Sequence, residues 1–133
     1  MPTGLFDFGR QAFLDADIDW SADTIRVVFI DTALYTVSLA TDQFLSSVPV
    51  GARVGTPQAL VGKTSTIGIA DADDVVFVSL AGASCEALLL YKDTGVDATS
   101  RLIWYCDTGV GLPFQPGGTN VTITWPALGI FKL

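Results

Sequence analysis

Histidine is absent from the 133-residue chain, which also holds only two cysteines and, among its 14 acidic residues, a single glutamate. The lack of histidine removes the usual general base, the usual zinc-binding nitrogen and the Ser-His-Asp triad in one step. A cysteine nucleophile would lack its usual partner for the same reason. We therefore expect a protein that is not an enzyme and that carries no cofactor.

Charge is also scarce. Charged residues make up 16% of the chain, against roughly 25% in an average globular protein. The formal net charge is −7, and the seven cations are scattered singly along the chain. An acidic chain without a basic cluster repels phosphate backbones, so we expect no nucleic-acid partner. Because half of the residues are hydrophobic, we also expect part of the surface to face another protein.

Long apolar runs are missing as well. No segment approaches the ~20 apolar residues of a membrane-spanning helix. The first residues lack the positive start and continuous apolar stretch of a secretory leader. We expect no membrane partner and synthesis in a cytoplasm. Cys85 and Cys106 lie inside apolar runs, which favours two buried thiols, with a disulfide between them as the alternative.

The patterns that are present indicate one mainly β domain over residues 1–133, with an N-terminal arm over 1–20 and a β core over 21–133. Apolar spacings of three and four predict a short helix over 5–15. A single helical turn is expected within 41–48. Runs of Val, Ile, Thr and aromatics predict strands at 24–31, 52–60, 62–69, 74–80, 85–92, 101–106, 119–125 and 129–133. About seven or eight short strands favour an antiparallel β-sandwich or small barrel.

Two of these strands are apolar on both faces, at 87–91 and 102–105. Such strands are covered on both sides. The second cover has to come from a helix, a long loop or a neighbouring subunit, and the last of these would indicate assembly. The segment 121–125 alternates instead, so Val121, Ile123 and Trp125 are expected to face the core.

Asp-Thr-Gly occurs twice, at 93–95 and 107–109, each time after an apolar strand. The same tripeptide carries the paired carboxylates of aspartic proteases. In a single-chain protease, however, each copy belongs to its own lobe, and these two copies begin only fourteen residues apart, which leaves no room for a lobe. We interpret both copies as turns, in which Asp accepts backbone hydrogen bonds and Gly takes a positive φ.

Two aspartate runs are candidate cation ligands. The first contains Asp15, Asp17 and Asp19, with the spacing that opens a calcium loop; the second contains Asp71, Asp73 and Asp74. Trp20 stands where an EF-hand needs glycine and Arg26 where it needs a bidentate glutamate, so an EF-hand is excluded. Solvated turn aspartates are the favoured interpretation, and a looser calcium or magnesium site at either run is the alternative.

Several stretches of the chain resemble small structural proteins of phage particles. They are Asp23 to Asp31, Thr41 to Leu45, Asp71 to Val75, Tyr91 to Gly95, Ala98 to Ile103, Thr122 to Trp125 and Gly129 to Leu133. In such proteins the segment after Phe44 is often longer and richer in glycine than it is here. The resemblance implies a component of the virion, made in the host cytoplasm, and brings no catalytic residues with it.

From these observations we expect a capsid decoration or cement protein on the outer surface of the head, in contact with the major capsid protein, with itself as a homo-oligomer such as a trimer, or with both. The negative charge suits an outer surface better than one facing DNA. A tail or tail-fibre module that attaches other tail proteins or host glycans is the alternative. Apolar residues near the chain ends are the expected contacts: Leu5, Phe6, Phe8, Phe13, Ile130, Phe131 and Leu133.

Overall fold

A five-stranded antiparallel sheet, ordered β1-β8-β7-β2-β3, forms the middle layer of the protein. The computed structural model describes residues 3–109 and 111–133. The strands of the middle sheet are Gly4–Leu5 (β1), Leu102–Cys106 (β8), Ala87–Lys92 (β7), Ile25–Ile30 (β2) and Arg53–Ala59 (β3). Within this sheet the neighbouring strands β7 and β2 are the longest pair, and they pair along six residues each.

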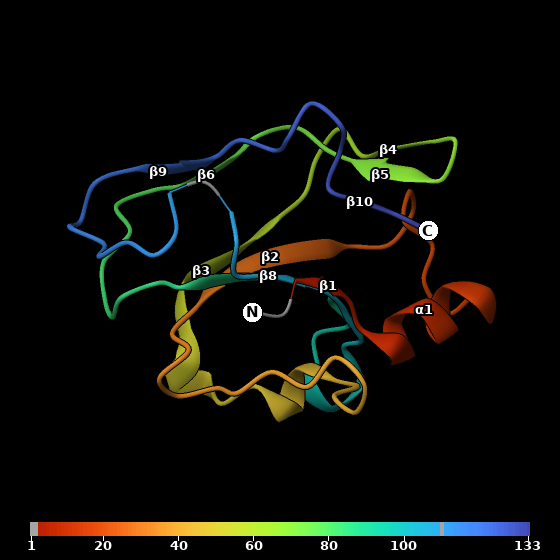
Figure 1. Cartoon of the computed structure of the whole chain (residues 1–133), viewed down its shortest axis with the longest axis horizontal. Helices are drawn as coiled ribbons and strands as arrows, with labels where there is room; N and C mark the ends of the chain where they lie inside the picture. Colours follow the sequence, from red (N-terminus) through yellow and green to blue (C-terminus); the bar gives the residue numbers. More distant parts are fainter. Residues whose placement is uncertain (1–2, 110) are drawn as a thin grey trace.

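Two small antiparallel sheets lie over one face of the middle sheet and form what we call the outer layer (Figure 1). One has the order β10-β5-β4 and the other pairs β6 with β9. Their strands are Thr64–Thr66 (β4), Ile69–Asp71 (β5), Val75–Phe77 (β6), Val121–Ile123 (β9) and Phe131–Lys132 (β10). The prediction of a mainly β, antiparallel sandwich is confirmed, and the layers do not close into a barrel.

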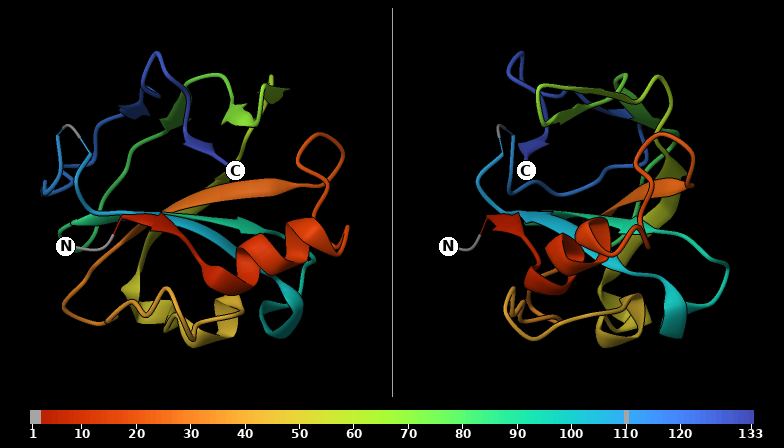
Figure 2. Two further views of the ribbon diagram at one scale, coloured as in Figure 1. Left: turned by 45° about the vertical axis from the view of Figure 1, so that its right-hand side comes forward. Right: turned by 90° about the vertical axis from the view of Figure 1, so that its right-hand side faces the viewer.

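The opposite face of the middle sheet is covered by the segment 31–52, which contains the 3-10 turns Leu45–Ser47 (η1) and Val50–Ala52 (η2). Figure 2 shows this segment below the sheet, next to a third turn at Asp97–Thr99 (η3). We call it the lower layer. The helical turn expected within 41–48 is present as η1. Its first residue, Leu45, is buried and anchors the turn.

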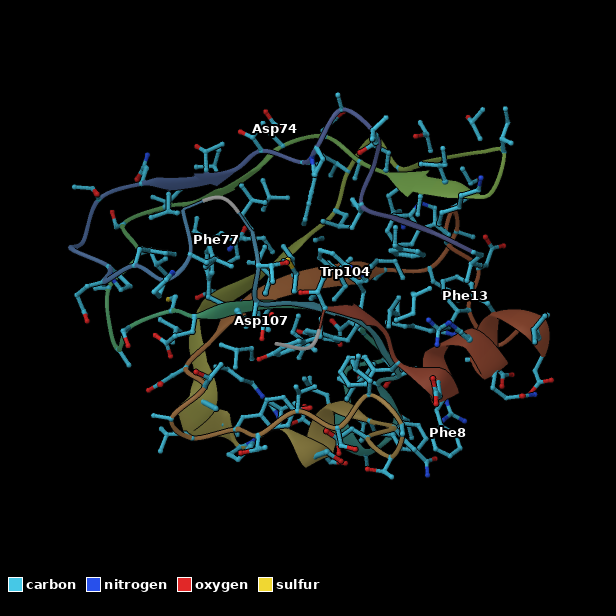
Figure 3. The ribbon with its side chains drawn as sticks, viewed as in Figure 1. Phe8, Phe13, Asp74, Phe77, Trp104 and Asp107 are labelled. Carbon is cyan, nitrogen blue, oxygen red and sulfur yellow. The ribbon has the colours of Figure 1, made fainter. Side chains whose placement is uncertain are left out.

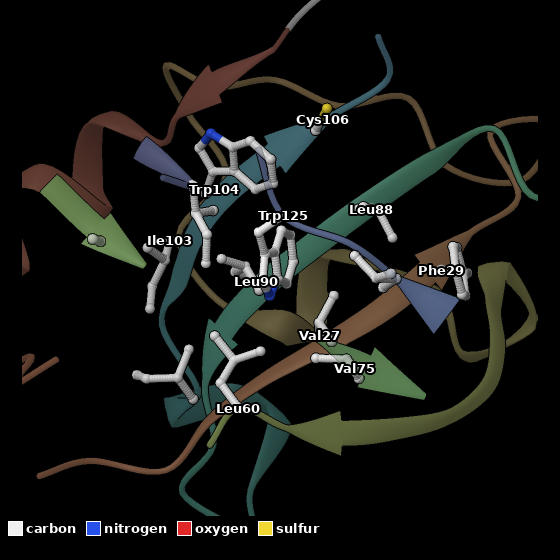
Figure 4. Close-up of a cluster of buried hydrophobic side chains, with 14 of the residues drawn as sticks. Val27, Phe29, Leu60, Val75, Leu88, Leu90, Ile103, Trp104, Cys106 and Trp125 are labelled. Carbon is white, nitrogen blue, oxygen red and sulfur yellow. The ribbon is translucent and has the colours of Figure 1, made fainter. Parts of the chain in front are cut away.

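The central strands divide their side chains between the two layers. From β7, Leu88 and Leu90 join the cluster under the outer layer, while Leu89 and Tyr91 join the cluster over the lower layer. Figure 4 shows the first of these clusters. The prediction that these strands are covered on both sides is thus confirmed. A loop of the same chain supplies the second cover, so these strands give no argument for a neighbouring subunit.

Polar contacts tie the lower layer to the sheet. The guanidinium of Arg53, on β3, donates to the carbonyl oxygens of Leu45 at 2.9 Å and Val48 at 2.7 Å. The Tyr35 hydroxyl donates to the Asp42 carboxylate at 2.6 Å. Burial, together with this carboxylate, raises the pKa of Tyr35. This hydrogen bond joins Tyr35 and Asp42 within the lower layer.

The helix Asp7–Leu14 (α1) lies inside the range predicted for it and runs along β8. Asp7 in its first turn is favourable for the helix dipole. Its buried positions are the small residues Gly9 and Ala12, which allow the helix backbone to approach the sheet closely. None of the helices in the described part of the chain is long and apolar enough to cross a membrane.

Two strands differ from the sequence prediction. The segment predicted as one strand over 62–69 is a hairpin, because β4 ends at Thr66 and β5 begins at Ile69 after a two-residue turn. The two-residue strand β1 was not predicted, because it is too short to show a periodicity. It forms by pairing with β8, where Gly4 lies opposite Tyr105 and Leu5 opposite Trp104.

We predict that Gly9→Ala destabilises the protein by about 1–3 kcal/mol, although alanine is the better helix former by about 1 kcal/mol. A Cβ at this position would lie 2.7 Å from the carbonyl oxygen of Leu102, a backbone atom that cannot rotate away. Urea unfolding followed by circular dichroism measures the difference. Gln11→Ala, an exposed position on the same helix, is the matched control and should not destabilise. An unchanged midpoint in Gly9→Ala would contradict the close packing of α1 on β8.

Candidate interaction face

The β6–β9 ribbon alternates between buried and exposed side chains. Val75 and Phe77 of β6 are buried, whereas Val76 between them is 44% exposed and pairs with the exposed Thr122. On β9, Ile123 is buried, and so is Trp125 just beyond it. The sequence prediction that Val121, Ile123 and Trp125 face the core is confirmed, since Val121, although half-buried, also packs against the core cluster under the outer layer. The ribbon therefore has an inner side in the core and an outer side open to solvent.

The ribbon joins two segments, 75–85 and 111–131, that contain no charged residue. We call the surface that they form the uncharged face. Hydrogen bonds beyond the strands hold the segments together. The Leu80 N–H donates to the Thr119 oxygen at 3.0 Å, and Cys85 and Phe114 exchange backbone bonds of 2.8 and 2.9 Å. All 21 charged residues of the chain lie outside these two segments.

Large aliphatic side chains protrude from the uncharged face. Val78 is 72% exposed and Leu128 is 87% exposed. Leu128 sits in a turn closed by the hydrogen bond from the Gly129 N–H to the Pro126 oxygen at 2.9 Å. Asp74 lies at the border of the face, just before β6, and is labelled in Figure 3. Covering such a surface removes apolar area from water without stripping water from a charge.

An apolar cleft of about 780 Å³ lies between the uncharged face and the middle sheet. Its volume is in the range of ligand-binding clefts, roughly 300–1,000 Å³. Its lining comes from β2, β7, β8, β9 and the segments beside them, and none of the described lining residues is charged: Phe29, Leu88, Trp104, Cys106, Thr108, Gly109, Gly111, Leu112, Phe114, Val121, Thr122, Ile123, Thr124, Trp125, Pro126 and Ile130.

Two tryptophans from opposite layers meet in this cleft. The rings of Trp104 and Trp125 have centroids 6.4 Å apart and planes at 70°, an edge-to-face arrangement. Figure 4 shows the two rings side by side above Leu90. The indole N–H of Trp125 donates to the Asp73 carbonyl oxygen at 3.0 Å, which fixes the ring of this residue. The cleft thus has a rigid aromatic wall.

The structure corrects part of the contact surface expected from the sequence. Leu5, Phe6 and Ile130 are 6%, 0% and 8% exposed and pack in the chain's own core, so they do not form a surface. Phe8, Phe13 and Phe131 are half-buried, and Phe13 contacts Phe131 with ring centroids 6.1 Å apart. Only Leu133 of the expected set, at 59%, is largely exposed. The reason is that β1 and β10 pair with strands of the same chain.

The aspartate runs do not converge into a ligand cluster in the described residues. In the first run, Asp19 accepts the backbone N–H groups of Ser21 and Ala22 at 3.1 Å. In the second run, Asp71 accepts the N–H of Ala72 at 2.9 Å. Asp19 thus closes a turn, whereas Asp71 is the last residue of β5 and bonds to the backbone of its neighbour.

The first Asp-Thr-Gly is a turn of the predicted kind. Asp93 accepts the Gly95 N–H at 2.8 Å, and Gly95 has a φ of +84°. The other oxygen of Asp93 accepts from the Arg26 guanidinium at 2.6 Å. In the second copy, Asp107 accepts the Thr3 hydroxyl at 3.1 Å. Both aspartates thus have structural partners from the same chain.

The hydrogen bond from Arg26, followed by that from the Gly95 N–H, holds the pKa of Asp93 below its ordinary value of 3.8. We predict that Asp93→Asn lowers stability at pH 7 by about 1 kcal/mol, since the ion pair is partly exposed. A lowered carboxyl pKa gives stability above pH 3.8 that is lost as the pH falls through the folded value. Wild type and variant should therefore converge in strong acid, as thermal unfolding from pH 7 to pH 2 would show. A difference that is constant across this range would contradict the role of the ionised carboxylate.

Cys85 and Cys106 are both buried, and both are free thiols. Burial, reinforced by the nearby carboxylates of Glu86 and Asp31, raises the pKa of Cys85 to about 12. A thiol with so high a pKa holds almost no thiolate at neutral pH and is a poor nucleophile.

Val76, Val78 and Leu128 were not among the residues that we expected at a contact surface. The charge-free stretches that carry them are visible in the sequence, but only the β6–β9 pairing brings the stretches together. In comparisons with known proteins, no family model and no curated protein sequence matches the chain.

Proposed function

We propose that this chain is a non-catalytic structural subunit of a phage particle, a decoration protein that docks on the major capsid protein through the uncharged face. The observation that carries the proposal is the segregation of charge. Segments 75–85 and 111–131, which the β6–β9 pairing joins, contain no charged residue, and the whole net charge of −7 comes from the rest of the chain. The resemblance of several stretches of the chain to small phage virion proteins is the reason for proposing a phage particle.

The physics of docking favours this orientation. A stable contact of standard size buries about 800 Å² on each partner. Burying a charge at such a contact is costly unless it is paired, and the uncharged face avoids this cost. The aspartates then remain in water on the outside of the head, away from the packaged DNA. Contacts of this kind stabilise the capsid by mass action.

We propose a non-catalytic role because the chain lacks suitable catalytic side chains. The sequence has no histidine, the Cys85 pKa is raised to about 12, and the two Asp-Thr-Gly aspartates are occupied with structural partners. These features support a binding role rather than a chemical one.

We predict that Val78→Asp weakens binding to heads by at least about tenfold, because the contact would then bury an unpaired carboxylate. Val78 is 72% exposed, so the unfolding midpoint should hardly change. The matched control is Val50→Asp, since Val50 is 73% exposed and begins η2 in the lower layer. Co-sedimentation with heads lacking the protein measures both variants.

Equal binding by wild type, Val78→Asp and Val50→Asp would contradict docking through the uncharged face. Immunogold labelling of intact particles gives an independent test of location. Label spread over the head supports decoration, whereas label at the tail tip alone would replace it with the tail-module alternative. A chain that is absent from purified particles would overturn the proposal altogether.

A further inference from the structure

The first two elements of the chain, β1 and α1, form one unit over residues 3–14 at the edge of the middle sheet. The strand β1 stands at the end of the strand order and pairs with β8. Just after it, the Phe6 N–H donates to the Ile103 oxygen at 2.9 Å, and the Phe6 side chain is fully buried. Figure 2 shows this β1–α1 unit beside the sheet, joined to the rest of the chain by the loop that follows α1.

The connection between the β1–α1 unit and the body of the protein is a tight turn with a strained residue. The Asp17 N–H donates to the Ala12 oxygen at 2.8 Å, and the Ala16 N–H donates to the Phe13 oxygen at 3.2 Å. These are the two bonds of a Schellman motif, which usually has glycine at the position of Ala16. Ala16 has a φ of +61°, a left-handed conformation that strains any residue with a Cβ. Because alanine is also the best helix former, this residue favours a helix that continues over one that turns.

The body of the protein is anchored directly after this turn. The Lys92 ammonium donates to the Asp17 oxygen at 2.5 Å. Ile18 and Trp20 are 4% and 7% exposed and belong to the core. The body side therefore stays in place when the turn opens, and the hinge is confined to Asp15 and Ala16.

We propose that two copies of the chain exchange their β1–α1 units, so that each unit packs on β8 of the other copy. The identity of the partner follows from contacts that already exist. In the second copy the unit makes the same strand pairing and the same burial of Phe6 that it makes in its own chain. Such an exchange is a low-cost route to a dimer, and a strained hinge favours it. The inference goes beyond docking on the capsid, because it joins copies of this chain to one another.

An exposed apolar side chain beside the hinge favours the exchanged form. Leu14 is the last residue of α1 and is 83% exposed. In a dimer with two-fold symmetry the two hinges run past each other, so the two Leu14 side chains come together near the axis. Exchange thus covers apolar surface that a single copy leaves in water.

Charge near the hinge opposes the exchange and sets its conditions. Asp15 and Asp17 flank Ala16, and both are exposed. In the dimer these carboxylates approach their counterparts in the other copy. Because salt screens the repulsion between exposed charges, we expect the exchanged fraction to rise with salt concentration.

Two introduced thiols report which chain supplies the unit. The hydroxyl oxygens of Thr3 and Thr108 lie 3.0 Å apart, between the start of the unit and the end of β8, and both residues are exposed. One preparation of the full chain carries Thr3→Cys and the other carries Thr108→Cys. In a mixture, exchange of the units places the two new thiols against each other. The native thiols of Cys85 and Cys106 are buried.

The two preparations are mixed in urea below the unfolding midpoint, returned to buffer and oxidised, and non-reducing electrophoresis measures the linked heterodimer. The control mixture combines Thr3→Cys with Val50→Cys, which lies in the lower layer and is 73% exposed. This mixture measures random collision between exposed thiols. We expect at least about tenfold more heterodimer from the first mixture, because exchange raises the effective concentration of one thiol at the other.

Ala16→Gly tests the hinge itself. Glycine takes a positive φ without strain and disfavours a continued helix, so both effects stabilise the closed single copy. We expect its dimerisation constant, measured by sedimentation velocity, to be at least about tenfold below that of wild type, since each dimer contains two hinges. The matched control is Ala22→Gly, an exposed position in the same loop that is not left-handed, and it should associate like wild type.

Three results would overturn the inference. They are a heterodimer yield no higher than that of the control mixture, undiminished association of Ala16→Gly, and an exchanged fraction that salt does not raise. None of these experiments uses heads, so unit exchange and capsid docking succeed or fail separately.

Discussion

The burial of the middle sheet on both faces is the constraint on which the rest of the structure depends. The strand β7 is apolar from Ala87 to Tyr91, and Leu88 and Leu90 face one layer while Leu89 and Tyr91 face the other. A 133-residue chain has to supply both covers itself or leave one face to a partner. It supplies both, with the segment 31–52 on one side and two small sheets on the other.

Because the chain covers both faces of its middle sheet, a partner has no access to those faces and would contact the outer layer instead. The small sheets need an apolar inner side, provided by residues such as Phe77 and Ile123, and the two strands of the ribbon have only three residues each. Their outer side is not covered by the chain. The segments that flank the β6–β9 ribbon, 78–85 and 111–120, carry no charged residue, whereas the connection before it holds Asp73 and Asp74.

The sequence by itself determined the class of the fold, because periodicity and turn residues are local: the helix Asp7–Leu14, the long strands and the 3-10 turn at Leu45–Ser47 lie within the predicted ranges. It also determined the scarcity of charge and of catalytic groups. Only the tertiary structure decided which apolar side chains are exposed to solvent, since Leu5 and Ile130 resemble Val78 in sequence but pack in the core. The uncharged face and its cleft exist because strand pairing over a long sequence separation brings 75–85 and 111–131 together, and no local pattern encodes that pairing.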